Sequence, residues 1–211
     1  MSGESELSAW IRHGRADSEP EAEMSWQRFV DYGITEVLGG KGHLAELRLF
    51  KSLWTSRLER QAVLRLRLVQ MLAHYGHAKL VDRQLAILAM RFGLHVEPRT
   101  VIGKGLRLSH PTSIVIGKGL KLGERCKLYQ QVTLAAAPLE DEPGMARVGD
   151  DVTIFPGAKF VGKGRVGNRV IVGANAVVAD VFGDDVVIGG VPARVIRQVR
   201  PDERTGSGRP E

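Results

Sequence analysis

The second half of the chain carries an aliphatic or aromatic residue at every sixth position. These positions fall into three registers: Val96, Ile102, Leu108, Ile114; then, after a two-residue slip, Ile116, Leu122, Leu128, Leu134; then, after a break, Val148, Ile154, Phe160, Val166, Val172, Val178. A helix would repeat every three or four residues, and an isolated strand would alternate. A fixed period of six instead indicates a β-solenoid.

Each hexad fits one short strand followed by a corner. The recurring apolar side chain then points into a narrow prism and stacks on its counterpart in the next coil. Glycine follows several of these residues directly, at Gly103, Gly117, Gly123, Gly149, Gly167 and Gly173. About 13 hexads, at three per coil, predict roughly four coils.

The first half of the chain has helical spacing instead. A short helix is expected from Trp26 to Leu38, a long one from His43 to about His74, and a third from Leu80 to Phe92, ended by Gly93. The predicted organisation follows from these patterns: a flexible arm (1–24), an α-helical domain (25–93), the solenoid (94–200) and a disordered tail (201–211).

The long helix is strongly basic. Residues 48–67 contain six cations against the single acid Glu59: Arg48, Lys51, Arg57, Arg60, Arg65 and Arg67. We interpret them as a solvated surface or a subunit contact, and contact with a membrane surface stays open. Nucleic-acid binding would rest on charge alone and is not expected.

Composition adds four points. Glycine makes up 25 of 211 residues, and 18 of these lie from Gly93 onward, most of them in the repeats. The single cysteine, Cys126, excludes an intrachain disulfide and a cysteine zinc site. The polar, acidic start does not have the form of a signal peptide, and no apolar run could span a membrane. A cytoplasmic location is therefore expected.

The repeats resemble the serine acetyltransferase branch of the hexapeptide acyltransferases. The segments that carry the resemblance are Ile-Gly-Lys-Gly-Leu-Arg-Leu-Ser-His (102–110) with the following Pro-Thr-Ser-Ile-Val-Ile-Gly, Ile-Val-Gly-Ala-Asn-Ala-Val-Val (171–178) and Gly-Gly-Val-Pro-Ala-Arg-Val-Ile (189–196). The resemblance covers about residues 78–200. It implies a left-handed parallel β-helix, a homotrimer (with a dimer of trimers through the N-terminal helices as an extension) and acetyl-CoA as donor.

The resemblance places the catalytic histidine at His110. Transfer of an acetyl group from a thioester to a hydroxyl needs a base whose pKa lies near the operating pH, which suits an imidazole. The family's orienting Asp, fifteen residues earlier, is replaced by His95. Glu97 is the candidate substitute for orienting His110.

Other departures concern the acceptor. The family's Asp directly before the histidine is Ser109 here, and a further histidine of the family corresponds to about Met145. These changes favour the branch that acetylates sugars over serine as acceptor. The break between Leu134 and Val148 holds three acids, Glu140, Asp141 and Glu142, which could bind a polar acceptor or form a solvated loop tip.

The donor side keeps more of the family pattern. The resemblance places the pantetheine arm along Gly157, Gly173 and Ala174, and the CoA phosphates near Arg194 and Arg197, where guanidinium groups pair well with phosphate. No metal is expected, because His95 and His110 alone do not make a zinc site.

Three functions follow, in order. The first is an acetyl-CoA-dependent O-acetyltransferase acting on a sugar or a capsular or exopolysaccharide, with His110 as general base and direct transfer in a ternary complex. The second is a serine O-acetyltransferase of cysteine biosynthesis. The third is a non-catalytic solenoid that serves as a scaffold or regulatory subunit.

Overall fold

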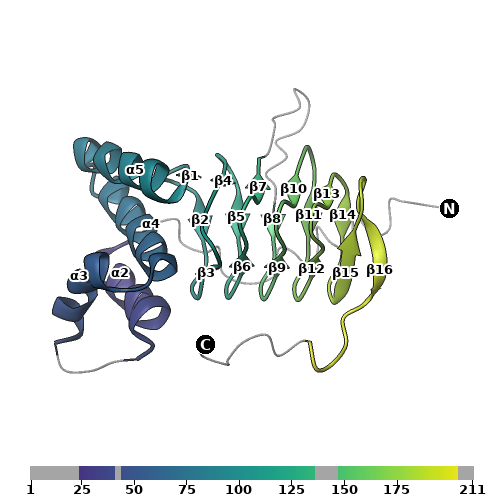
Figure 1. The fold of residues 1–211 in the computed structure, drawn as a ribbon, viewed down its shortest axis with the longest axis horizontal. Helices are drawn as coiled ribbons and strands as arrows, with labels where there is room; N and C mark the ends of the chain where they lie inside the picture. The colour runs from purple at the N-terminus through teal and green to yellow at the C-terminus, as the bar shows by residue number, and fades with distance from the viewer. Residues whose placement is uncertain (1–23, 41–43, 136–146, 204–211) are drawn as a thin grey trace.

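Helices precede a solenoid of short strands, as expected (Figure 1). The computed structural model describes residues 24–40, 44–135 and 147–203. The helices are α2 (Trp26–Gly33), the π-helix η1 (Ile34–Leu38), α3 (Ala45–Thr55), α4 (Leu58–His74) and α5 (Ala78–Phe92). Gly93 ends α5 in the left-handed conformation (φ 58°), and its N–H donates to the carbonyls of Ala89 and Leu88. None of the helices in the described ranges is long and apolar enough to cross a membrane.

The single helix expected over residues 43–74 is wrong. It is divided between α3 and α4 at Ser56 and Arg57, where ψ is 171° and 151°. The Ser56 hydroxyl donates to the carbonyl of Ser52 at 2.6 Å, and the Gln61 amide donates to the Ser56 carbonyl at 2.7 Å. Apolar spacing continues across this break, so the pattern alone does not show it.

The surface interpretation of the basic residues is also wrong for Arg65 and Arg67, which are buried in α4. All five N–H donors of the Arg67 guanidinium are used. They bond both carboxylate oxygens of Glu36 (3.0 and 2.7 Å), the Gln70 side chain (3.0 Å), and the carbonyls of Ile102 and Gly103 (2.8 and 2.6 Å).

Glu36 completes this buried cluster. Its carboxylate also accepts the backbone N–H groups of Gly105 and Leu106, at 2.8 and 3.0 Å, and its side chain has no exposed surface. Arg67 and Glu36 therefore join α4 and η1 to the first coil of the solenoid.

The solenoid is a three-sided prism of parallel sheets. Its strands are β1 (Leu94–Val96), β2 (Val101–Ile102), β3 (Arg107–Leu108), β4 (Ile114–Ile116), β5 (Lys121–Leu122), β6 (Lys127–Leu128), β7 (Thr133–Leu134), β8 (Arg147–Val148), β9 (Thr153–Ile154), β10 (Lys159–Phe160), β11 (Arg165–Val166), β12 (Ile171–Val172), β13 (Val177–Val178), β14 (Val181–Phe182), β15 (Val186–Gly189) and β16 (Arg194–Gln198).

Consecutive strands belong to different sheets. Sheet A has the order β1-β4-β7-β10-β13, sheet B the order β2-β5-β8-β11-β14, and sheet C the order β3-β6-β9-β12-β15, to which β16 adds in antiparallel orientation. The register pairs equivalent hexad positions, for example Ile102 with Leu122. Four full turns separate β1 from β13, which confirms the expected number of coils.

The core of the prism contains two residues from most hexads. The recurring residues of the sixfold period are buried, as predicted. A second buried set precedes them by two positions: Leu106, Leu120, Cys126, Val132, Val152, Ala158, Val170 and Ala176. The corners of the prism leave little room for a side chain. A Cβ on Gly103 would lie 2.6 Å from the carbonyl carbon of Gly123 in the next coil. This close approach explains why glycine follows the core residue there.

Cys126 belongs to the second buried set, and burial raises the pKa of its thiol to about 12. Its Sγ lies 3.2 Å from the Gly149 carbonyl oxygen, to which the thiol donates. Because the thiolate is the reactive form, we expect no reaction of the native protein with dithionitrobenzoate at about pH 8, and reaction of one thiol per chain in denaturant. Labelling of the native protein at the rate of a free cysteine would contradict this expectation.

The same shift has a consequence for stability. The folded-state pKa of Cys126 is raised above the ordinary thiol value of about 8.5. The contribution of the protonated Cys126 thiol to the free energy of unfolding is therefore fully present below about pH 8.5, and it is lost as the pH rises toward 12.

Candidate active site

One edge of the prism brings together His110 and the predicted donor-binding positions Gly157, Gly173 and Ala174. We call it the His110 edge; it consists of the turns that join sheet C to sheet A, residues 109–113, 129–132, 155–158 and 173–176, and of the β15–β16 turn, residues 190–193, which is hydrogen-bonded to Val177 of β13. Backbone N–H groups link successive turns: Gln131 to the Thr112 carbonyl (2.8 Å), Gly157 to that of Gln130 (3.1 Å), and Asn175 to that of Pro156 (2.9 Å). Positions up to 80 residues apart in sequence thus lie along one line, with coils about 4.8 Å apart.

His110 lies at the first-coil end of this edge. Its backbone is in the left-handed region (φ 51°), and its carbonyl accepts the N–H of Thr112 at 2.6 Å. Its side chain is exposed, while the following Pro111 is buried. The imidazole makes no hydrogen bond or ion pair with any residue in the described ranges. It is therefore accessible to a substrate that approaches the edge.

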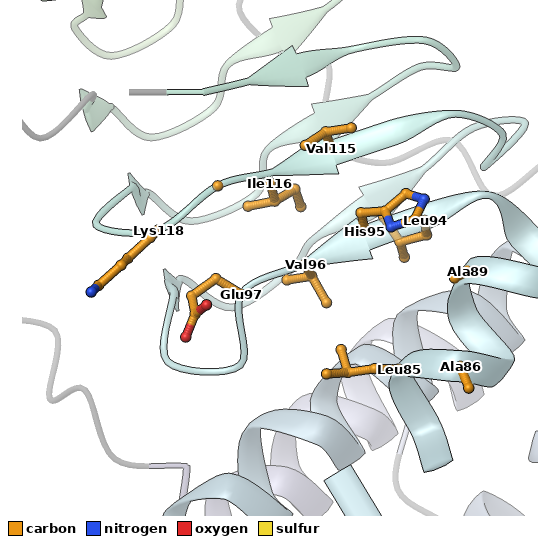
Figure 2. Close-up of a pocket in the computed structure, with 11 residues that line it drawn as sticks. Leu85, Ala86, Ala89, Leu94, His95, Val96, Glu97, Val115, Ile116 and Lys118 are labelled. Carbon is orange, nitrogen blue, oxygen red and sulfur yellow. The ribbon is translucent and has the colours of Figure 1, made fainter. Parts of the chain in front are cut away.

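His95 and Glu97 lie in a groove that His110 does not line. This open groove of about 480 Å³ lies between α5 and strands β1 and β4, and Lys118 lies at the same end as Glu97 (Figure 2). Among the described residues, neither His95 nor Glu97 bonds the imidazole of His110, so an orienting role for either stays a prediction.

Two further predictions from the sequence concern the binding of the acceptor. Ser109 directly precedes His110 and is half-buried, and its N–H donates to the Leu128 carbonyl at 2.8 Å. Glu140, Asp141 and Glu142 lie outside the described residues, so their proposed role is not tested.

An aromatic pair on the same edge was not predicted from the sequence. Tyr129 and Phe155 stack with ring centroids 5.2 Å apart and an interplanar angle of 11°, and Lys127 lies 4.8 Å from the centroid of Tyr129. Each ring directly follows a buried core residue of sheet C, the position that Ser109 and Gly173 occupy in other coils. Comparing this position from coil to coil would have revealed the pair.

The predicted donor-binding positions lie along the same edge: Gly157 is in the turn that holds Phe155, and Gly173 and Ala174 are in the next turn. The turns that hold Tyr129 and Phe155 therefore lie between Ala174 and His110 along the edge. Gly157 has a φ of 75°, and a Cβ there would collide with the side chain of Asn175. Ala174 is exposed and its side chain is small, which leaves the edge open at this level.

The two predicted phosphate ligands lie at opposite ends of β16. Arg194 pairs with Gly189 at the His110 edge and lies 3.4 Å from the Asp180 carboxylate. Arg197 pairs with Val187, and its guanidinium makes two 2.7 Å bonds to Glu203, which raise its pKa. Arg194 is thus the better placed of the two for a ligand on this edge.

No group of three or more His, Cys, Asp or Glu side chains in the described part of the chain is arranged to hold a metal ion.

Comparison with known proteins gives sequence relatives for the repeats. No family model matches the chain. The serine acetyltransferase of Mycobacterium tuberculosis is 36% identical over 109 residues, which are 52% of this chain and 48% of that protein. The serine acetyltransferase of Staphylococcus aureus strain Mu50 is 31% identical over 132 residues, 61% of this chain and 62% of that protein. The chain therefore matches about half to three fifths of the length of these relatives.

Solved structures share the fold. The serine acetyltransferase of Brucella abortus strain S19 has a TM-score of 0.66 at 22% identity, covering 83% of this chain and 70% of that one. A serine acetyltransferase in complex with CoA has a TM-score of 0.67 at 23% identity, covering 81% and 71%. The expected left-handed parallel β-helix with preceding helices is thereby confirmed.

Proposed function

We propose that this protein is an acetyl-CoA-dependent O-acetyltransferase whose active site lies along the His110 edge. The observation that carries the proposal is that His110 shares one open edge with Gly157, Gly173 and Ala174, although these positions are far apart in sequence. The similarity to serine acetyltransferases supports it, because one solved relative of the same fold is a complex with CoA.

The chemistry follows from the exposure of His110. Its imidazole removes the proton from the acceptor hydroxyl as that oxygen attacks the thioester carbonyl. The carbon–sulfur bond then breaks, and the same imidazole returns the proton to the departing thiolate of CoA. The acetyl group passes directly to the acceptor, so no covalent enzyme intermediate is needed.

L-Serine is the acceptor that the relatives favour, since those named above are serine acetyltransferases. This reverses the order expected from the sequence, where a glycan came first. A sugar hydroxyl stays the second candidate on one observation: Ser109 stands where the resemblance expects the carboxylate that helps to hold the amino-acid acceptor, so an acceptor ammonium would lack that partner.

An acceptor assay separates the two candidates. Release of CoA from acetyl-CoA is followed with dithionitrobenzoate in the presence of L-serine or of free hexoses and N-acetylhexosamines. Release that depends on L-serine supports the first candidate, and release that depends on a sugar supports the second. If neither acceptor works and the protein does not bind CoA, a scaffold role replaces both.

Blocking the donor path gives a separate prediction. Ala174→Trp places a large ring on the exposed His110 edge, and we expect the KM for acetyl-CoA to rise about tenfold or more, since the arm would lose its contact surface there. The matched control is Val161→Trp, at an exposed position on another corner of the prism. An equal effect of both variants, measured by steady-state kinetics, would contradict the placement of the donor.

The expected trimer also belongs to this proposal. Light scattering of the purified protein tests it, with three times 23.1 kDa as the trimer mass and six times as that of the dimer of trimers.

A further inference from the structure

Helix α3 has an apolar face on each side. Its inner face is buried in the helical core through Leu49 and Leu53. Its outer face carries Leu47, Phe50 and Trp54, at helical spacing of three and four, with exposed fractions of 65, 36 and 67%. A helix that packs against the core on one side needs only one such face.

The outer face continues onto neighbouring segments. The indole of Trp26 stacks on Phe50 with centroids 5.9 Å apart, and Leu44 and Leu58 are more than half exposed. We call this surface the α3 patch; its residues are Trp26, Leu44, Leu47, Phe50, Trp54 and Leu58. Clustered large apolar side chains on a surface mark a binding site more often than isolated ones do. In Figure 1, α3 lies at the end of the molecule opposite β16.

Cations accompany the patch. Arg48, Lys51, Arg57 and Arg60 are exposed on α3 and the start of α4, and none of them is in an ion pair with another residue of the described ranges. The same stretch carries the acids Glu46 and Glu59. Four cations against two acids leave this surface positively charged, even though Arg65 and Arg67 are buried.

We propose that the α3 patch binds the surface of an anionic phospholipid membrane, with α3 lying in the plane of the interface. Leucine and aromatic side chains would enter the headgroup boundary, where the polar edge of the Trp54 indole can stay hydrated. The long side chains of Arg48 and Lys51 can reach up to lipid phosphates while their stems cover apolar surface.

The charge distribution favours a membrane over a second copy of the chain. A two-fold contact through the α3 patch would bring together two surfaces that each carry four cations against two acids, and surfaces of like net charge repel. Anionic headgroups neutralise these cations instead. This inference does not depend on the acetyl-transfer proposal.

Vesicle co-sedimentation tests the proposal. The full chain is mixed with vesicles of phosphatidylcholine alone, or with 30% phosphatidylglycerol added, at about 50 and 500 mM salt. We expect binding to the anionic vesicles that weakens at high salt. Leu47→Gln with Trp54→Gln should weaken it about tenfold or more, and so should Arg48→Gln with Lys51→Gln. Met90→Ala, at an exposed apolar position on α5, is the control and should bind like the wild type.

Two results would overturn the proposal. One is the absence of binding to anionic vesicles at low salt by a protein whose thermal melt shows that it is folded. The other is a wild type that binds no vesicles and whose assembly size, measured by light scattering, differs from that of the variant with Leu47→Gln and Trp54→Gln. That result would assign the patch to self-association.

Discussion

Replacement of His110 by alanine is expected to lower the rate of acetyl transfer by about 10²–10⁴-fold, the usual contribution of a positioned general base. Since the imidazole is exposed and bonds no residue of the described ranges, its loss should not change the fold. CoA should still bind, because the predicted donor positions lie in later coils of the same edge. Steady-state release of CoA measures the effect.

The matched control is His77→Ala. His77 is an exposed histidine at the start of α5 whose side chain makes no capping bond. Its replacement should leave the rate within about twofold of the wild type. An unchanged rate in His110→Ala would remove the assignment of the base.

Loss of Arg67 should have the largest effect on stability. Arg67→Ala leaves the Glu36 carboxylate buried without its cation and removes all five bonds of the guanidinium, so we expect a loss of about 3–5 kcal/mol in the free energy of unfolding. For a chain of this size that corresponds to a fall in Tm of roughly 10 °C. Urea unfolding of the wild type and the variant, followed by circular dichroism, measures the difference.

Two further variants interpret that result. Lys104→Ala removes an exposed ion pair with Asp31 and should cost no more than about 1 kcal/mol. Glu36→Gln removes the charge and one of the two accepting oxygens, which leaves the Arg67 guanidinium buried without its anion, so it should cost about as much as Arg67→Ala. A loss below about 1 kcal/mol in Arg67→Ala would show that this cluster does not hold the helices to the solenoid.

The solenoid could be predicted because its signal is local and repeats. Each hexad shows its core residue, as at Leu128 and Ile154, and the period reports the architecture without any long-range information. The second set of core positions has the same period, but residues as different as Cys126 and Leu106 occupy it. Small residues such as Ala158 and Ala176 at several of its positions make its period less regular than that of the first set.

The helical region was harder to predict because its decisive contacts are distant in sequence. Arg67 is buried because Glu36 and the carbonyls of the first coil surround it, and nothing in the spacing of α4 indicates those partners. In the sequence, its charge instead suggested a solvated position.

The candidate site was predicted in part. The resemblance gave His110 and the small residues of the donor positions, and the structure places them on one edge. The stacking of Tyr129 on Phe155 depends on which residues face each other across coils, which becomes clear when equivalent positions of successive hexads are compared. The partner that orients His110 stays a prediction, since its imidazole contacts no acid in the described ranges.

Calorimetric titration of CoA tests the central claim, that the His110 edge holds the donor, most directly. We predict that the wild type, His110→Ala and Val161→Trp bind CoA with similar affinity, and that Ala174→Trp binds it about tenfold more weakly or not at all. Equal binding by Ala174→Trp and the wild type, or no binding by the wild type, would contradict the account.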